Sequence, residues 1–196
     1  MNYLSQIILH KQEAVRYRLR DSYAWHRVLW DTFPGRNGDS RQFLFRIDDH
    51  HPYFRVLLLS PYRPVIPGWG QWECRDVSAT FLNHKKYRFQ LKANPTMRRV
   101  SDRRRIGIYA EPRLRDWITR KANNHGFSIE PNTITLSTPI DEVFFRDGHR
   151  GKHVSVDFRG VLRVTAPDVF RLTFQKGIGA AKAFGFGLLM LDPLPT

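Results

Sequence analysis

Three side chains that could move a proton beside a phosphate stand close together in the chain: Tyr23, His26 and Arg27. Histidine exchanges a proton near neutral pH, and a nearby arginine can hold a phosphate. At about 100° per residue of helix, Tyr23 and His26 lie one turn apart, on a face next to the apolar one. This spacing is compatible with acid–base catalysis. The alternative, from these residues alone, is a surface histidine without a catalytic role.

A second candidate site is the glycine-rich stretch GIGAAKAFGFG at residues 177–187. Its spacing fits neither a Walker loop nor the dinucleotide fingerprint, since Lys182 stands where those motifs need other neighbours. Exposed N–H groups and a lysine suit a sugar-phosphate backbone, whereas a tight turn before a last strand is the structural alternative. The residues that would contact nucleic acid here are Gly177, Gly179, Lys182, Gly185 and Gly187.

Two further segments are basic. The run MRRVSDRRR at residues 97–105 is too charged for a core, and FRDGHRGKH at residues 145–153 has the glycines of a hairpin tip. A basic hairpin tip can enter a nucleic-acid groove, and the alternative for both segments is a solvated run of charge. The candidate contact residues are Arg98, Arg99, Arg103, Arg104, Arg105, Arg146, Arg150 and Lys152.

The net charge points to a polyanion as partner. The 196 residues carry a formal charge of +14, and the halves 1–94 and 95–196 each carry +7. An even distribution of charge over a chain rich in hydrophobic and aromatic residues argues against a disordered basic tail. It indicates a globular protein whose two halves both face one extended anion.

Several classes of function find no support in the residues. The single cysteine, Cys74, excludes an intrachain disulfide and a multi-cysteine zinc site, and no His or Asp/Glu cluster has metal-ligand spacing. No run approaches the roughly 18 apolar residues of a membrane helix, and the first residues lack a signal-peptide pattern. We therefore expect a cytoplasmic protein without a metal, a small-molecule cofactor or a membrane partner.

The first half predicts the order β-α-β-β-α-β of a ferredoxin-like unit. A helix over residues 23–32 follows Asp21 and Ser22, either of which can cap it, and Pro34-Gly35 ends it. The other elements expected in this half are strands at 3–10, 42–48, 53–60 and 86–93, a loop at 61–70 and a short helix at 77–83.

The second half repeats this order more loosely. Helices are expected at 112–125 and 167–174, and strands at 133–137, 143–146, 153–164 and 188–191. The fold class is therefore α+β, with two tandem ferredoxin-like (RRM-like, βαββαβ) domains. We expect residues 1–94 to carry the catalytic helix, and residues 95–196 to carry the basic hairpin and the glycine-rich loop.

Six stretches in series resemble the CasE family, the CRISPR-associated endoribonucleases that process repeat RNA in type I-E systems. They are YLSQIIL, DSYAWHRVLWDTFP, QFLFRID, RFQLKANP, FRGVLRV and KGIGAAKAFGFGLLMLDPL, in the order of the family and across nearly the whole chain. One departure is Ala180, where the family commonly has proline.

The resemblance implies two tandem ferredoxin-like domains and an endoribonuclease that binds the hairpin of CRISPR repeat RNA. It implies metal-independent cleavage at the base of the stem by attack of the 2′-OH, which leaves a cyclic phosphate. The family's catalytic histidine and tyrosine match His26 and Tyr23, and Arg27 is a candidate to stabilise the phosphate. The groove-binding hairpin matches Arg146, Arg150 and Lys152. The enzyme would keep its product RNA as a subunit of the Cascade complex.

Two other functions remain open from the sequence. A non-catalytic tandem RNA-binding module or scaffold subunit would carry the same charge and fold, although no intact RRM signature is present. A basic DNA-binding or ribosomal protein would bind duplex DNA as well as RNA.

Overall fold

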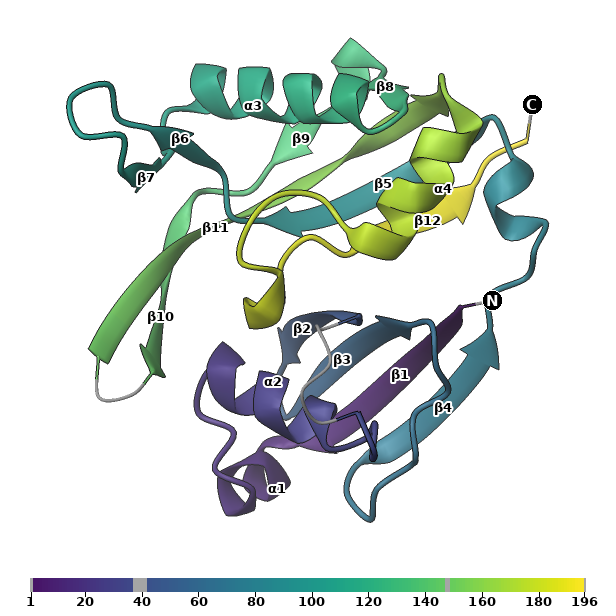
Figure 1. Ribbon diagram of the computed structural model, residues 1–196, viewed down its shortest axis with the longest axis vertical. Coiled ribbons are helices and arrows are strands. Elements are labelled where there is room, and N and C mark those ends of the chain that lie inside the picture. The colour runs from purple at the N-terminus through teal and green to yellow at the C-terminus, as the bar shows by residue number, and fades with distance from the viewer. Residues whose placement is uncertain (1, 37–41, 147–148, 196) are drawn as a thin grey trace.

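The computed structural model describes residues 2–36, 42–146 and 149–195, and its two main sheets lie in the two halves of the molecule (Figure 1). The first sheet is antiparallel with the order β2-β3-β1-β4. Helices α1 and α2 cover one of its faces. The elements of this half are β1 (Tyr3–His10), α1 (Lys11–Arg16), α2 (Ser22–Trp30), β2 (Leu44–His50), β3 (Tyr53–Ser60) and β4 (Gln71–Asp76).

The second sheet has the central order β10-β11-β5-β12, and the short strands β8 and β9 also pair with β11. Helices α3 and α4 pack on it. Its elements are β5 (Lys86–Ala93), α3 (Glu111–Asn124), β8 (Phe127–Ile129), β9 (Thr135–Leu136), β10 (Ile140–Arg146), β11 (His149–Val164), α4 (Pro167–Lys176) and β12 (Leu189–Pro193). A separate ribbon is formed by β6 (Thr96–Arg98) and β7 (Arg105–Gly107), and single turns lie at η1 (Phe81–Asn83), η2 (Pro131–Thr133) and η3 (Lys182–Phe184).

The first sheet is buried on both faces. Phe45 and Leu58 belong to the core beneath α1 and α2, whereas Leu44, Leu57 and Leu59 belong to the core of the second half. This explains why β3 reads as a continuous apolar run rather than as an alternating one. The two halves therefore share packing, and the first sheet holds α2 in a fixed position relative to the second half.

A buried arginine adds a polar connection between the halves. Arg46 on β2 is 4% exposed, and its Nε and Nη1 lie 2.7 Å and 2.6 Å from carboxylate oxygens of Asp48 and of Asp157 on β11. Burial alone would raise the pKa of the Asp48 carboxyl, but Arg46 and Arg55 beside it bring that pKa below its ordinary value. Arg46 thus pairs with Asp48 in its own half and with Asp157 in the second half, and connects the two halves.

The α+β class with two ferredoxin-like units in tandem is confirmed, and the strands at 3–10, 53–60 and 86–93 begin and end as predicted. One expected element is wrong, since residues 77–83 form only the single turn η1 instead of a helix. Strand β4 lies in a segment for which no element was predicted.

The strand at residues 86–93 also lies elsewhere than expected. It was assigned to the first unit, but β5 pairs with β11 and β12 of the second sheet, and β4 fills the fourth place in the first sheet. The pairing partners of β5 are remote in sequence, so its own residues did not reveal its sheet. We propose that the division between the units falls within residues 77–85 rather than after Asn94.

Candidate active site

Helix α2 begins at a carboxylate that also holds the neighbouring hairpin. Asp21 is the N-cap, as the sequence allowed, and its Oδ1 accepts the N–H of Ala24 at 2.9 Å. Its Oδ2 accepts the backbone N–H of Phe145 on β10 at 2.9 Å. The β10–β11 hairpin extends beyond the second sheet toward α2 (Figure 1). One side chain thus fixes both the start of the helix and the place of the hairpin.

His26 lies on α2 against a wall of aromatic rings. Its ring centroid is 5.9 Å from that of Trp30, 5.6 Å from Phe43 and 6.3 Å from Phe45. The side chain is half-buried, and its Nε2 is shielded from solvent. Close packing on several sides leaves the imidazole one position, which is what a group that transfers a proton at a defined atom needs.

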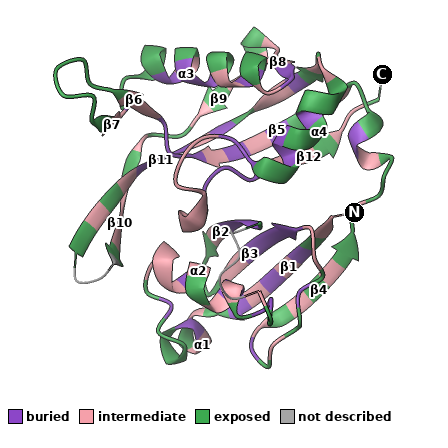
Figure 2. Cartoon of the chain, in the orientation of Figure 1, coloured by how far each residue is buried: buried purple, intermediate pink, exposed green. Residues whose placement is uncertain are grey.

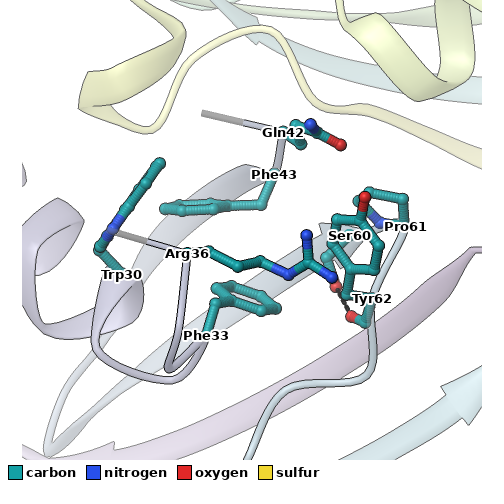
Figure 3. A pocket seen from close by; sticks show the side chains of 8 residues that line it. All are labelled: Trp30, Phe33, Arg36, Gln42, Phe43, Ser60, Pro61 and Tyr62. Carbon is teal, nitrogen blue, oxygen red and sulfur yellow. Dashed lines mark hydrogen bonds between the residues drawn. The ribbon is translucent and has the colours of Figure 1, made fainter. Parts of the chain in front are cut away.

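The aromatic wall continues into a small apolar pocket behind His26. Figure 3 shows Trp30, Phe33 and Phe43 there, with the guanidinium of Arg36 over the ring of Tyr62, 3.3 Å from the ring centroid. The cavity measures only about 20 Å³, which is room for a single water molecule. The cavity is too small for a nucleotide. The side chains packed around it hold Trp30 and Phe43 in place against His26.

The sequence-predicted trio meets in one cleft. Tyr23, His26 and Arg27 line a cleft of about 380 Å³ whose opposite wall is Ala183 and Phe184 of the glycine-rich segment. The ring of Tyr23 stacks on Phe184, with centroids 6.3 Å apart. A phenol, an imidazole and an exposed guanidinium around one cleft can transfer a proton and hold a negatively charged phosphate.

The glycine-rich segment is built as a structural loop against the first half. All four of its glycines have φ between +71° and +89°, which side chains rarely adopt. The N–H groups of Gly177 and Gly187 donate to the carbonyls of Thr173 and Lys92. Because these two amides are hydrogen-bonded within the protein, Gly177 and Gly187 fit the alternative of a tight turn before the last strand. The segment also places Phe184 in the cleft.

The other residues of this segment differ in their surroundings. Gly179 faces the ring of Trp117, and Gly185 faces that of Phe45. Lys182 is half-buried and lines a cavity of about 470 Å³ together with Gln175 and Lys176. Lys182 is not among the residues that line the cleft around His26.

A second histidine, His153, lies on the other side of Phe184. Its ring stacks on Phe144 and touches Phe184, with both centroid distances at 4.7 Å. Burial lowers the pKa of His153, and the Glu142 carboxylate opposes this shift. His153 was not among the residues predicted to belong to a site. Its side chain lies on the face of β11 opposite to the buried Val154, so alternation along the strand alone would not have revealed that Phe144 and Phe184 cover it.

The predicted basic residues are exposed and come from two hairpins. Arg98, Arg99, Arg103, Arg104 and Arg105 all lie on the β6–β7 ribbon, which is exposed in Figure 2. Arg150 and Lys152 are exposed on β11, while the side chain of Arg146 lies outside the described residues. Arg105 and Lys152 line one cavity of about 570 Å³. The two basic segments therefore converge, next to Ala180 and Ala181 of the glycine-rich loop.

The described residues contain neither a candidate metal site nor a membrane-spanning helix. Among them, no group of three or more His, Cys, Asp or Glu side chains is placed to hold a metal ion. None of the helices in the described part of the chain has the length and apolar character to cross a membrane.

Comparison with known proteins gives a match over almost the entire chain. The model of a family described as CRISPR associated protein matches residues 2–193. The chain is 32% identical to the CRISPR system Cascade subunit CasE of Escherichia coli, covering 98% of this chain and all of that protein. It is 29% identical to the CRISPR-associated endoribonuclease Cse3 of Thermus thermophilus, covering 97% of this chain and all of that protein.

Solved structures agree with these matches. The crystal structure of the CRISPR-associated protein Cas6e from Escherichia coli superposes with a TM-score of 0.72 at 29% identity, covering 99% of this chain and 100% of that one. Thermus thermophilus Cse3 bound to an RNA representing a pre-cleavage complex has the same fold, with a TM-score of 0.84 at 24% identity. That match covers 98% of this chain and 99% of the other.

Proposed function

The chain belongs to the CasE family of CRISPR associated proteins, and from this membership we propose that it is the endoribonuclease that cuts CRISPR repeat RNA. It binds the stem-loop of the precursor, cuts at the base of the stem without a metal, and keeps the product as a subunit of Cascade. The observation that carries this proposal is the cleft in which Tyr23, His26 and Arg27 meet, in a chain related to CasE over its full length.

The chemistry needs no added nucleophile because RNA carries its own. The 2′-oxygen upstream of the cut forms a bond to the adjacent phosphorus while the bond from phosphorus to the downstream 5′-oxygen breaks. The 2′-OH loses a proton and the 5′-oxygen gains one, leaving a 2′,3′-cyclic phosphate and a free 5′-OH. The enzyme must align these atoms, move the protons and stabilise the charge on the phosphate.

The residues of the cleft divide these tasks. The packed imidazole of His26 transfers a proton at the reacting oxygens. The phenol of Tyr23, steadied by its stack on Phe184, orients the phosphate or joins the proton network. Arg27 is exposed at the edge of the cleft, where its guanidinium can approach the phosphate oxygens.

The RNA stem is held outside this cleft by the basic hairpins. The exposed arginines of β6–β7 and the pair Arg150 and Lys152 on β11 bind phosphates of the stem and of the nucleotides next to it, and these contacts supply most of the affinity. Their convergence on one cavity supports a single path for the RNA over the second half of the molecule.

A change to the RNA tests the chemistry without touching the protein. A single 2′-deoxy nucleotide at the cut site removes the nucleophile, so the hairpin should bind with unchanged affinity and stay uncut. Cleavage of this deoxy substrate, measured on a denaturing gel against the all-ribose hairpin, would contradict attack by the 2′-OH. A protein that binds both hairpins and cuts neither would be the non-catalytic module instead.

A further inference from the structure

An exposed tyrosine in the second half is held rigidly by its hydroxyl. Tyr109 follows the β6–β7 ribbon and is 48% exposed. Its hydroxyl donates to Oδ1 of Asp141 at 2.6 Å, and this hydrogen bond raises the pKa of Tyr109, so the phenol stays protonated. An aromatic ring that is open to solvent but fixed at its tip loses little conformational freedom when something stacks on it.

The same carboxylate holds a cation beside the ring. Nζ of Lys152 donates to Oδ2 of Asp141 at 2.6 Å, so both oxygens of Asp141 are engaged. The carboxylate therefore keeps the ammonium group of Lys152 and the phenol ring of Tyr109 side by side. An aromatic face next to a cation is the pairing that single-stranded nucleic acids use: the base stacks and the phosphate meets the charge.

Tyr109 and Lys152 line a cavity of a size that suits a nucleotide. It measures about 570 Å³ and is also lined by Arg105, Asn94 and His153. Gly107 forms part of its floor, where a Cβ would collide with Val154. The arginine adds a second positive charge, whereas Asn94 is buried and its Nδ2 lies 3.1 Å from Nδ1 of His153.

The cavity adjoins the catalytic cleft across the glycine-rich loop. Ala180 and Ala181 form one wall of the cavity, while Ala183 and Phe184 form a wall of the cleft around His26. Along the chain, only Lys182 separates these two pairs of residues, a span of about 7 Å of extended backbone at most. A strand cut in the cleft can reach the cavity within a few nucleotides.

We propose that this cavity is a binding site for one unpaired ribonucleotide of the bound RNA, whose base stacks on Tyr109 while its phosphate meets Lys152 and Arg105. The proposal rests on the RNA-cleaving function proposed above. It gives the enzyme a means to sense an unpaired nucleotide next to the stem, which duplex-binding arginines cannot distinguish.

A coupled substitution of protein and RNA tests this site. The probe is the repeat hairpin with a 2′-deoxy nucleotide at the cut site, and its unpaired nucleotides next to the stem are made abasic one at a time. Stacking of one base is worth about 1–3 kcal/mol, so Tyr109→Leu should weaken binding of the intact probe by roughly 5- to 150-fold. When the base that stacks on Tyr109 is the one removed, the wild-type protein should bind that abasic probe as weakly as Tyr109→Leu binds the intact probe. Tyr109→Leu should then cause no further loss of affinity for the abasic probe.

Two variants separate stacking from other roles. Tyr109→Phe keeps the ring and loses only the bond to Asp141, so it should retain most of the affinity. Tyr17→Leu, which removes a tyrosine of similar exposure in the first half, should change nothing. A 2-aminopurine at the responsive position should lose fluorescence on binding to the wild type and to Tyr109→Phe, but not on binding to Tyr109→Leu.

The outcomes that overturn the site are distinct from failure of the function. If the wild type cuts the all-ribose hairpin while Tyr109→Leu weakens every probe equally, or none, the stacking site is wrong and the nuclease stands. If the wild type neither binds nor cuts the hairpin, the proposed function falls and the site falls with it. The proposal would also be contradicted if Tyr109→Leu weakened binding of a free mononucleotide but did not change binding of the hairpin.

Discussion

His26 and the arginines of the β6–β7 ribbon lie in opposite surroundings. The imidazole is packed among Trp30, Phe43 and Phe45, whereas the five arginines extend into solvent from a two-stranded ribbon. Proton transfer depends on the position of a few atoms, while counterion release depends only on accessible charge. The contrast indicates that chemistry and affinity are separable here, and that substitutions in one region should leave the other intact.

The largest effect is expected at the packed histidine. His26→Ala removes the proton-transfer group, so cleavage of the repeat hairpin should fall by about 100- to 10 000-fold in single-turnover assays. The dissociation constant of the same hairpin should stay within about twofold, because phosphate contacts carry the affinity. His51→Ala, at an exposed histidine, is the matched control and should cut normally. A joint loss of binding and cleavage would show that the regions are not separable.

The next largest effect is expected at Arg46, which connects the two halves. Arg46→Met leaves the half-buried Asp157 without its cation and Asp48 with Arg55 alone, so the free energy of unfolding should fall by about 3 kcal/mol. Urea denaturation measures this. Arg75→Met breaks an exposed pair with Glu73 and should cost about 1 kcal/mol or less. Equal losses for the two variants would mean that Arg46 does not lock the halves together.

The same ion cluster predicts a loss of stability in acid. The pKa of Asp48 is lower in the folded protein than in the unfolded chain, so its contribution is complete above the ordinary value of about 3.9. As the pH falls below that value toward the folded pKa, the unfolded chain takes up the proton first and this stability is lost. Asp48→Asn should make unfolding less dependent on pH in this window. An unchanged pH profile would argue against the ion cluster.

A smaller effect is expected where the two regions are connected. Asp21→Ala removes the helix cap and should lower the free energy of unfolding by about 1 kcal/mol. Asp21→Ser can still cap α2 but is too short to reach Phe145 as well. Both variants lose the hydrogen bond that holds the β10–β11 hairpin beside α2, which is worth about 1 kcal/mol. If that energy positions the RNA for cleavage, both should cut roughly fivefold more slowly. Normal cleavage by Asp21→Ser would show that the hairpin needs no such anchor.

The smallest change concerns a single exposed charge. Arg150→Ala should weaken binding of the hairpin and reduce the slope of log Kd against log salt by about 1. At saturating protein, its cleavage rate should match that of the wild type. A titration series between low and moderate salt measures the slope, and a slower cut at saturation would place Arg150 in the catalytic cleft instead.

Much of the local structure could be predicted because it rests on local signals. The apolar run of β3, the alternation of β5 and the cap at Asp21 all follow from neighbouring residues. Strand β4 could not be predicted, since QWECRD is polar at the edge of the sheet and is held there by pairing with β1. The sheet to which β5 belongs depends on distant partners, which is why the first unit was given the wrong fourth strand.

The candidate site also contains residues that could be predicted from the sequence and residues that could not. Tyr23, His26 and Arg27 could be found from the spacing of one helix and from family resemblance. The rings around them could not, because Phe43, Phe45 and Phe184 come from segments remote from α2. The set of Tyr109, Asp141 and Lys152 likewise joins three separate segments. Only Lys152 was predicted to contact nucleic acid, because Tyr109 and Asp141 alone read as ordinary surface residues.

One measurement tests the central claim, that this cleft cuts RNA by attack of its own 2′-OH with His26 moving a proton. The repeat hairpin is incubated with the wild type and with His26→Ala in EDTA, and the product ends are identified by mass spectrometry. The wild type should give a 2′,3′-cyclic phosphate and a 5′-OH at the base of the stem, and His26→Ala should leave the bound hairpin uncut. A 5′-phosphate product, loss of wild-type cleavage in EDTA, or full cleavage by His26→Ala would contradict it.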